Sequence, residues 1–263
     1  MTPAEHQAAA AALLEAERSG HQIGLLSVAY PGINMDDAYA IQSEIAKAKL
    51  AEGRRIVGWK IGLTSKAMQQ ALGIDIPDSG ILFDDMDFAP GSTVPAGRFI
   101  QPRIEAEIAF VMKSPLSGDV TRADVIAATD YVAPALEILD TRIVRKDDEG
   151  RIRIIYDTIS DNAANGGFVL GKERHALDDY DLRHVGAICM RNGEVEETGL
   201  GAGVLNDPVE SVVWLAQRMG QYGQAIEPGQ VVLSGSFVRP IECPPESRIE
   251  ADYGSFGSVT VSF

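Results

Sequence analysis

The sequence predicts an α+β fold in which an N-terminal helical layer precedes a curled, barrel-like mixed sheet. Three observations carry this prediction. Helical periodicity with capping residues dominates residues 1–53, short apolar segments separated by turn signals dominate residues 54–263, and no repeat or low-complexity linker divides the latter. Many short strands with few helices are typical of α+β domains. We therefore expect a helical layer over residues 1–53 and one mixed β-roll domain over residues 54–263.

Two helices are predicted in the N-terminal layer. Thr2-Pro3-Ala4-Glu5 combines a capping box with proline at the first helical position, so a helix should follow to about Arg18 and end at Gly20. A second helix should begin after Asn34, where apolar residues recur at helical spacing, and end at Gly53.

Most of the remaining elements should be strands. Asn192-Gly193 between two apolar segments is typical of a type I′ hairpin, and Thr121 and Asp207 are typical helix caps. The predicted strands span 55–61, 99–112, 131–139, 183–190, 195–199, 231–234, 248–253 and 258–263, and the predicted helices span 66–72, 122–129 and 207–220.

The charge of the chain restricts its partners. Of 263 residues, 45% are hydrophobic and 23% charged, which is the composition of a globular protein. A formal net charge of −15 argues against nucleic acid or an anionic membrane as partner, because both need a positive surface. The first 20 residues lack the basic start and apolar run of a signal peptide, and no segment approaches the roughly 20 apolar residues of a membrane span. We therefore expect a cytoplasmic protein.

Three acids in strand-like sequence are the strongest functional signal. Glu105 and Glu107 alternate with apolar residues in Arg-Ile-Glu-Ala-Glu-Ile, and Glu137 lies in Pro-Ala-Leu-Glu-Ile-Leu. Side chains two apart on a strand share a face, and buried carboxylates are costly unless something positive neutralises them. A hard divalent cation, Mg²⁺ or Mn²⁺, suits such oxygen donors. The alternative is a solvent-facing pair on an edge strand and an unrelated acid.

Lys60 interrupts an apolar strand between Gly58 and Gly62. A strand lysine is usually an edge residue whose ammonium reaches solvent, but the flanking glycines and apolar neighbours favour a position against a ligand. Burial would lower its pKa and nearby carboxylates would raise it, and the sequence does not decide between them. A lysine that titrates near the working pH could transfer protons.

Two further segments are ambiguous. Asp78, in Pro-Asp-Ser-Gly, is typical of a turn. Residues 159–167, which include Ser160, are small and polar, and are read either as an ordinary irregular loop or as a loop that lines a polar pocket.

Nucleophilic and phosphate-binding chemistry fit the sequence poorly. It has no Gly-x-Ser-x-Gly elbow and no Gly-rich phosphate loop, and its four histidines are expected to be structural or exposed. Cys189 and Cys243 lack the spacing of zinc ligands and are expected to be structural thiols.

Four segments together resemble one known family. They are Gly-Trp-Lys-Ile-Gly-Leu-Thr-Ser at 58–65, Arg-Ile-Glu-Ala-Glu-Ile-Ala-Phe at 103–110, Tyr-Val-Ala-Pro-Ala-Leu-Glu-Ile-Leu-Asp at 131–140 and Asp-Thr-Ile-Ser-Asp-Asn-Ala-Ala-Asn at 157–165. With them, nearly the whole chain resembles the hydratase/decarboxylase branch of the fumarylacetoacetate hydrolase superfamily. The Glu-x-Glu pair with a distal Glu marks the superfamily, and Lys-Ile-Gly-Leu-Thr-Ser marks the branch.

The resemblance implies roles for particular residues. It implies a fumarylacetoacetate-hydrolase-like mixed β-roll and a homo-oligomer built from dimers. The implied ligands of Mg²⁺ (or Mn²⁺) are Glu105, Glu107 and Glu137, the implied proton-transfer residue is Lys60, and Asp78 and Ser160 are implied at the active site.

The implied activity is addition of water to a small 2-oxo dicarboxylate, 2-oxo-hept-4-ene-1,7-dioate, which gives 4-hydroxy-2-oxoheptanedioate in homoprotocatechuate (4-hydroxyphenylacetate) degradation. A 4-oxalocrotonate-type decarboxylase and a 2-hydroxypenta-2,4-dienoate hydratase are the alternatives. A C–C hydrolase fits less well because these motifs contain no histidine, and the intact lysine and acids disfavour a non-catalytic scaffold. Arg142, Arg145 and Arg153 are candidates by location for the distal carboxylate, and none is assigned.

Overall fold

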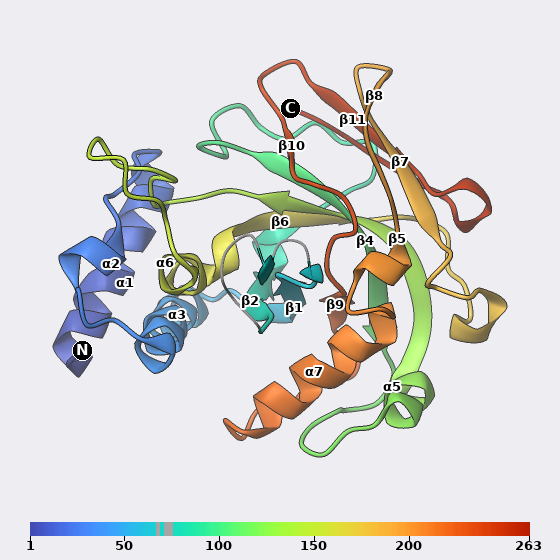
Figure 1. The fold of residues 1–263 in the computed structure, drawn as a ribbon, viewed down its shortest axis with the longest axis horizontal. Helices are drawn as coiled ribbons and strands as arrows, with labels where there is room; N and C mark the ends of the chain where they lie inside the picture. Colours follow the sequence, from blue (N-terminus) through green and yellow to red (C-terminus); the bar gives the residue numbers. More distant parts are fainter. Residues whose placement is uncertain (67–68, 71–75) are drawn as a thin grey trace.

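The N-terminal helices and α6 (Ile155–Ser160) gather at one end of the molecule, and the strands, with α5 (Arg122–Ala128) and α7 (Pro208–Gly220) beside them, form the rest (Figure 1). The computed structural model describes residues 1–66, 69–70 and 76–263. The N-terminal helices are α1 (Pro3–Ser19), α2 (Leu26–Ala29) and α3 (Met35–Ala51), and α6 contacts both α2 and α3.

Both predicted N-terminal helices are confirmed together with their caps. The Thr2 side chain accepts a hydrogen bond from the backbone N–H of Glu5, and Glu5 accepts one in return, as the capping box requires. Asn34 caps α3 in the same way, and α1 ends at Gly20, whose φ of 71° is left-handed. The buried faces of these helices share an apolar cluster with Ile143, so a later segment of the chain packs against the helical layer.

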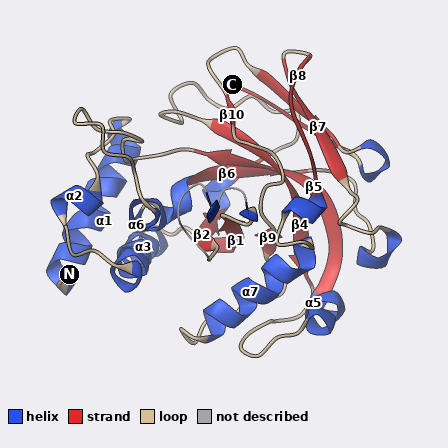
Figure 2. Ribbon diagram, viewed as in Figure 1, coloured by secondary structure: helices blue, strands red, loops and turns tan. Residues whose placement is uncertain are grey.

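Two sheets make up the strand-rich part (Figure 2). The larger has the order β2-β1-β9-β4-β5-β6-β3, with β10 paired to β4, and the smaller has the order β12-β11-β7-β8. The larger sheet is mixed, because β1–β9 and β3–β6 are parallel and its other pairs antiparallel. Its strands are β1 (Ile56–Gly62), β2 (Asp78–Phe83), β3 (Asp87–Phe88), β4 (Arg103–Met112), β5 (Thr129–Leu139), β6 (Asn165–Leu170), β9 (Val231–Leu233) and β10 (Ile241–Glu242), and those of the smaller sheet are β7 (Gly186–Arg191), β8 (Glu194–Leu200), β11 (Arg248–Asp252) and β12 (Ser258–Ser262).

The predicted α+β fold is confirmed, and the larger sheet is curled. Figure 1 shows β4 and β5 as long, curved strands. β1 and β5 are separated by two strands in the sheet order, yet Lys60 on β1 lies 3.3 Å from Glu137 on β5. Curling brings the inner face of the sheet around one point, and side chains from distant strands meet there.

The later predicted helices and the hairpin are also confirmed. α5 (Arg122–Ala128) has a capping box at Thr121, and Asp207 caps α7 (Pro208–Gly220). Asn192 and Gly193 have φ values of 54° and 85°, as a type I′ turn requires. The predicted helix at 66–72, ended by Gly73, includes residues outside the described part of the chain.

The reading of residues 159–167 as an irregular loop is wrong. Ile159 and Ser160 end α6, a left-handed turn follows at 162–164, and β6 begins at Asn165. Two of the small residues, Gly166 and Gly167, lie in β6, and glycine is needed there because neighbouring aromatic rings leave no room for a side chain. A Cβ on Gly166 would lie 2.9 Å from the Phe99 ring, and one on Gly167 would lie 2.7 Å from the Phe88 ring.

Two other features complete the fold. Asp78 is the first residue of β2 and not a turn residue, because it pairs with Gly62 of β1. In the part of the chain that the structure describes, no helix combines the length and the apolar character that crossing a membrane would require.

Candidate metal centre and its lysine

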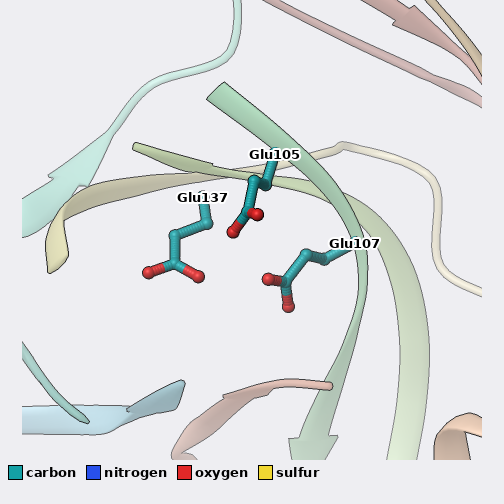
Figure 3. Close-up of side chains that lie close together, drawn as sticks. All are labelled: Glu105, Glu107 and Glu137. Atoms are coloured by element: carbon teal, nitrogen blue, oxygen red, sulfur yellow. The ribbon is translucent and has the colours of Figure 1, made fainter. Parts of the chain in front are cut away.

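Three glutamates meet on the inner face of the β4–β5 pair. The register places Glu105 directly opposite Glu137, and Glu107 lies on the same face two residues along β4. One carboxylate oxygen from each lies within 4.8 Å of the others. Figure 3 shows the three side chains directed into one common space. Like charges directly opposite one another destabilise a sheet, so this arrangement calls for a positive partner.

Burial makes the repulsion strong. The side chains of Glu107 and Glu137 are fully buried. Burial, followed by the charge of Glu137, raises the pKa of Glu105 to about 8, and the same two causes raise the pKa of Glu107 well above its ordinary range. A cation bound among these carboxylates would favour the charged form of each.

In both Glu107 and Glu137, one carboxylate oxygen accepts a hydrogen bond from a neutral donor and the other has no hydrogen-bond partner among the described residues. The backbone N–H of Gly235 donates to Glu107 Oε2 at 2.7 Å, and Asn165 Nδ2 donates to Glu137 Oε1 at 2.8 Å. The remaining atoms, Glu107 Oε1, Glu137 Oε2 and Asn165 Oδ1, are buried and accept no hydrogen bond from the described residues. Each buried acceptor left unsatisfied costs about 1–3 kcal/mol. A hard divalent cation would satisfy oxygen atoms placed in this way, so the donor set fits one.

Lys60 lies beside this cluster and is itself buried, with 3% of its surface exposed. Its Nζ is 3.3 Å from Glu137 Oε1 and 4.0 Å from Asp78 Oδ1. Burial alone lowers the pKa of Lys60, but the charges of Glu137 and Asp78 outweigh it, and the pKa is raised. The lysine is therefore a buried ammonium whose protonation depends on the carboxylates around it.

Asp78 reaches Lys60 because the facing residue is glycine. A Cβ on Gly62 would lie 2.2 Å from Asp78 Oδ1 and 3.0 Å from Lys60 Nζ, so a side chain there would displace both charged groups. Burial raises the pKa of Asp78, although Lys60 opposes this, and Asp78 Oδ1 accepts no hydrogen bond from the described residues.

Ser160 is placed less directly. It is the last residue of α6, which contacts β2, and its hydroxyl is buried and has no hydrogen-bond partner among the described residues. The structure thus brings Lys60, Asp78 and the three glutamates together. Ser160 lies at the end of α6, and its buried hydroxyl has no partner among the described residues.

A cavity of about 370 Å³ leads to the cluster. Glu105 lines it, together with residues that follow β1, such as Thr64, and residues of the segment after β9, such as Ser236 and Phe237. Pockets of this size hold small organic ligands, so a small molecule can approach the carboxylates from this side.

The cysteines do not take part. Cys189 and Cys243 are buried and unpaired, as expected for structural thiols, and burial raises the pKa of each to about 12. Thiolate nucleophiles are therefore absent at neutral pH from the described site.

Sequence reasoning assigned no individual role to three residues that shape the centre. Asn165 and Gly235 orient Glu137 and Glu107, as described above. Tyr253, a buried residue directly after β11, places its hydroxyl between β4 and β5, where it accepts a hydrogen bond from the N–H of Glu107 and can donate to the carbonyl of Ala135 at 2.6 Å. These contacts span 28 to 146 residues of sequence, and no local pattern marks them.

Replacement of Tyr253 by phenylalanine should destabilise the fold by about 1–3 kcal/mol, because the backbone groups of Glu107 and Ala135 lose a buried partner. We also expect weaker binding of a divalent cation, since the same hydroxyl fixes the backbone of Glu107. Denaturant unfolding and a cation titration would measure both effects. Tyr180→Phe is the matched control, because it removes an exposed hydroxyl that bonds the carbonyl of Ser255. Equal stability of the two variants would contradict the role of Tyr253.

Comparison with known proteins gives consistent results. No family model matches the chain. The chain is 49% identical over 260 residues to 2-oxo-hept-4-ene-1,7-dioate hydratase of Escherichia coli, covering 98% of this chain and 97% of that protein. It is 42% identical over 264 residues to 2-keto-4-pentenoate hydratase of Paraburkholderia xenovorans, covering 100% and 96%. Among solved structures, 4-oxalocrotonate decarboxylase from Pseudomonas putida G7, complexed with magnesium and adipate, superimposes with a TM-score of 0.95 at 36% identity, covering 100% and 98%.

Proposed function

Because the chain belongs to the hydratase/decarboxylase branch of the fumarylacetoacetate hydrolase superfamily, we propose that it is a metal-dependent hydro-lyase acting on 2-oxo-hept-4-ene-1,7-dioate. The product is 4-hydroxy-2-oxoheptanedioate, formed in the degradation of aromatic compounds. The observation that carries the proposal is the 49% identity to a hydratase of this substrate over nearly the full length of both chains. The buried glutamates beside Lys60 support it.

Glu105, Glu107 and Glu137 would hold the divalent cation, for which we propose Mg²⁺, with Mn²⁺ as a substitute. When bound, the cation supplies Lewis-acid polarisation of the substrate's 2-oxo group and offsets the charge of the three carboxylates. The relative solved with magnesium supports this choice.

Lys60 is the residue that we propose for proton transfer. Water can add at C4 only when the double bond is conjugated with the 2-oxo group, so one proton must leave C3 and one must be delivered to C5. The ammonium of Lys60 can deliver a proton, and the amine that results can accept one. Offsetting the carboxylate charges would remove the main cause of its raised pKa, so burial would then lower that pKa towards the working range.

Asp78 and Ser160 would assist this transfer. Asp78, 4.0 Å from Lys60 Nζ, would orient the ammonium. The unpartnered hydroxyl of Ser160 would be free to form a hydrogen bond with the substrate or the attacking water.

In this proposal residues 54–263 form the catalytic domain and residues 1–53 its helical layer. The active protein is a cytoplasmic homo-oligomer built from dimers.

Decarboxylation is the second candidate, and the observation that favours it is the TM-score of 0.95 to a 4-oxalocrotonate decarboxylase. Purified protein with Mg²⁺ would be given 2-oxo-hept-4-ene-1,7-dioate and, separately, 2-oxo-hex-4-ene-1,6-dioate. Formation of 4-hydroxy-2-oxoheptanedioate without CO₂ would support the hydratase. Rapid release of CO₂ from the six-carbon acid, with no hydrated product from either, would contradict it.

Binding of Mg²⁺ should release protons and become tighter as the pH rises from 6 to 8. The pKa of Glu105, about 8 against an ordinary 4.5, means that the folded, cation-free protein binds more protons than the unfolded chain between these values. Its stability should therefore fall as the pH rises through this range, and Mg²⁺ should restore it. Calorimetric titration in two buffers of different ionisation enthalpy measures the protons released. An affinity for Mg²⁺ that is constant from pH 6 to 8 would contradict this prediction.

A further inference from the structure

The three arginines between residues 142 and 153 have different surroundings, and this decides which of them is free to bind a ligand. A seven-carbon diacid carries a second carboxylate at the end remote from its 2-oxo group. On a chain with a net charge of −15, that group needs a local cation. The question rests on the proposed function, since it concerns the same site and substrate.

Arg142 forms hydrogen bonds within the protein and is not free to bind a ligand. It is buried, and its Nε lies 2.5 Å from Asp161 Oδ1. Its two terminal nitrogens donate to the carbonyl oxygens of Asn165, at 2.8 Å, and Asp161, at 2.7 Å. Each of its three nitrogens thus donates to the protein, and this arginine fixes the segment that leads into β6.

Arg145 faces a different part of the surface. Together with Arg103 and Arg191 it lines a separate groove of about 780 Å³, whose lining includes none of the proposed catalytic or metal-binding residues. Its side chain donates to the carbonyl of Gln101 at 3.3 Å.

Arg153 is partly buried and lacks a carboxylate partner among the described residues. Its Nη1 donates to Thr141 Oγ1 at 2.7 Å. A guanidinium has five N–H donors, and this bond uses one of them. Thr141 Oγ1 in turn donates to Asp161 Oδ2 at 3.3 Å, and Asp161 directly follows Ser160, so Arg153 lies on the Ser160 side of the site. In agreement with this position, the positive charge of Arg153 lowers the pKa of Asp78, the carboxylate beside Lys60. Burial lowers the pKa of Arg153 itself, as expected for a desolvated cation without a close counter-ion.

Asp161 and Asp157 are the acids whose negative charges act most strongly on Arg153, and both are held by hydrogen bonds from other groups. Asp157 accepts hydrogen bonds from the N–H and the hydroxyl of Ser27, at 2.8 and 2.7 Å, and from the N–H of Ile154. Asp161 is bound by Arg142. The fold thus keeps a half-buried guanidinium that forms no ion pair with a carboxylate of the described residues, which is costly for a group with only a structural role.

We propose that Arg153 binds the distal carboxylate of the substrate and thereby selects dicarboxylates over monocarboxylates. A guanidinium pairs with a carboxylate through two parallel hydrogen bonds, which fixes the position of the remote end of the chain. Hydratases of similar sequence are named for 2-oxo-hept-4-ene-1,7-dioate and for 2-keto-4-pentenoate, which lacks a distal carboxylate, so such a residue would separate the two specificities.

Steady-state kinetics of Arg153→Met on both substrates tests the proposal. We expect KM for 2-oxo-hept-4-ene-1,7-dioate to rise roughly 10–100-fold, with kcat little changed, and kcat/KM for 2-oxo-pent-4-enoate to stay within about twofold. Arg153→Lys should restore part of the affinity for the diacid. Arg145→Met is the matched control and should leave both substrates unaffected. A KM for the diacid within twofold of wild type, or an equal loss on both substrates, would overturn the proposal.

A binding measurement separates this proposal from the proposed function. Calorimetry with the unreactive saturated acids 2-oxoheptanedioate and 2-oxopentanoate, in the presence of Mg²⁺, requires no turnover. Arg153→Met should weaken binding of the diacid alone, roughly 10–100-fold. If wild-type protein binds the diacid through Arg153 but hydrates neither alkene, the proposed reaction fails and this inference stands. If the variant binds the diacid as tightly as wild type, the inference fails.

Discussion

Replacement of Lys60 by methionine should lower kcat by about 10²–10⁴, the usual contribution of a positioned proton-transfer group. Methionine keeps most of the side-chain volume and removes the ammonium that lies 3.3 Å from Glu137. The substrate should still bind, because the proposed contacts to its two carboxylates are not altered. Single-turnover kinetics with Mg²⁺, combined with calorimetry using an unreactive 2-oxo acid, would separate the two effects.

The same variant should bind Mg²⁺ at least as tightly as wild type. Removal of a positive charge next to Glu137 and Asp78 leaves the cluster more negative, which favours a divalent cation. The cation-free variant should be less stable for the same reason, so activity must be assayed with Mg²⁺ in excess. Activity within tenfold of wild type under those conditions would refute the role of Lys60 in proton transfer.

Glu107→Gln should weaken Mg²⁺ binding by at least about 100-fold, since loss of groups that merely orient metal ligands already costs 10–100-fold. The amide keeps an oxygen to accept the hydrogen bond from Gly235 but lacks the charge that holds the cation. Without Mg²⁺ the variant should be more stable than wild type, because one of three buried, mutually repelling carboxylates is gone.

These opposite effects distinguish a metal ligand from a structural acid. Thermal unfolding with and without Mg²⁺ would measure both, and activity should require far higher Mg²⁺ concentrations than in wild type. Glu197→Gln is the control, because Glu197 lines the same cavity but lies outside the three-glutamate cluster. A Glu107→Gln variant with wild-type Mg²⁺ affinity would remove Glu107 from the metal site.

Local signals in the sequence were sufficient for much of the fold. The helix starts at Thr2, Asn34 and Thr121 and the Asn192-Gly193 turn are patterns of neighbouring residues, and each has the predicted structure. Residues 159–167 were misread because small and polar residues are typical of loops. Only the structure shows that Gly166 and Gly167 lie in a strand against aromatic rings.

The candidate site was predicted in its residues but not in its geometry. Strand alternation places Glu105 and Glu107 on one face, but the register that sets Glu137 opposite Glu105 depends on how β4 and β5 pair. The net pKa shift of Lys60 likewise depends on the distances to four carboxylates from three other strands. Asn165 lay within a quoted motif without a role, and its bond to Glu137 became apparent only from the fold.

A divalent cation held between β4 and β5, next to Lys60, is the central claim. Crystals grown with Mn²⁺ and measured at the manganese absorption edge would test it most directly. We predict an anomalous peak bonded to one oxygen each of Glu105, Glu107 and Glu137, with metal–oxygen distances of roughly 2.0–2.3 Å. Well-ordered carboxylates that diverge from one another, with no anomalous peak among them at saturating Mn²⁺, would contradict the account.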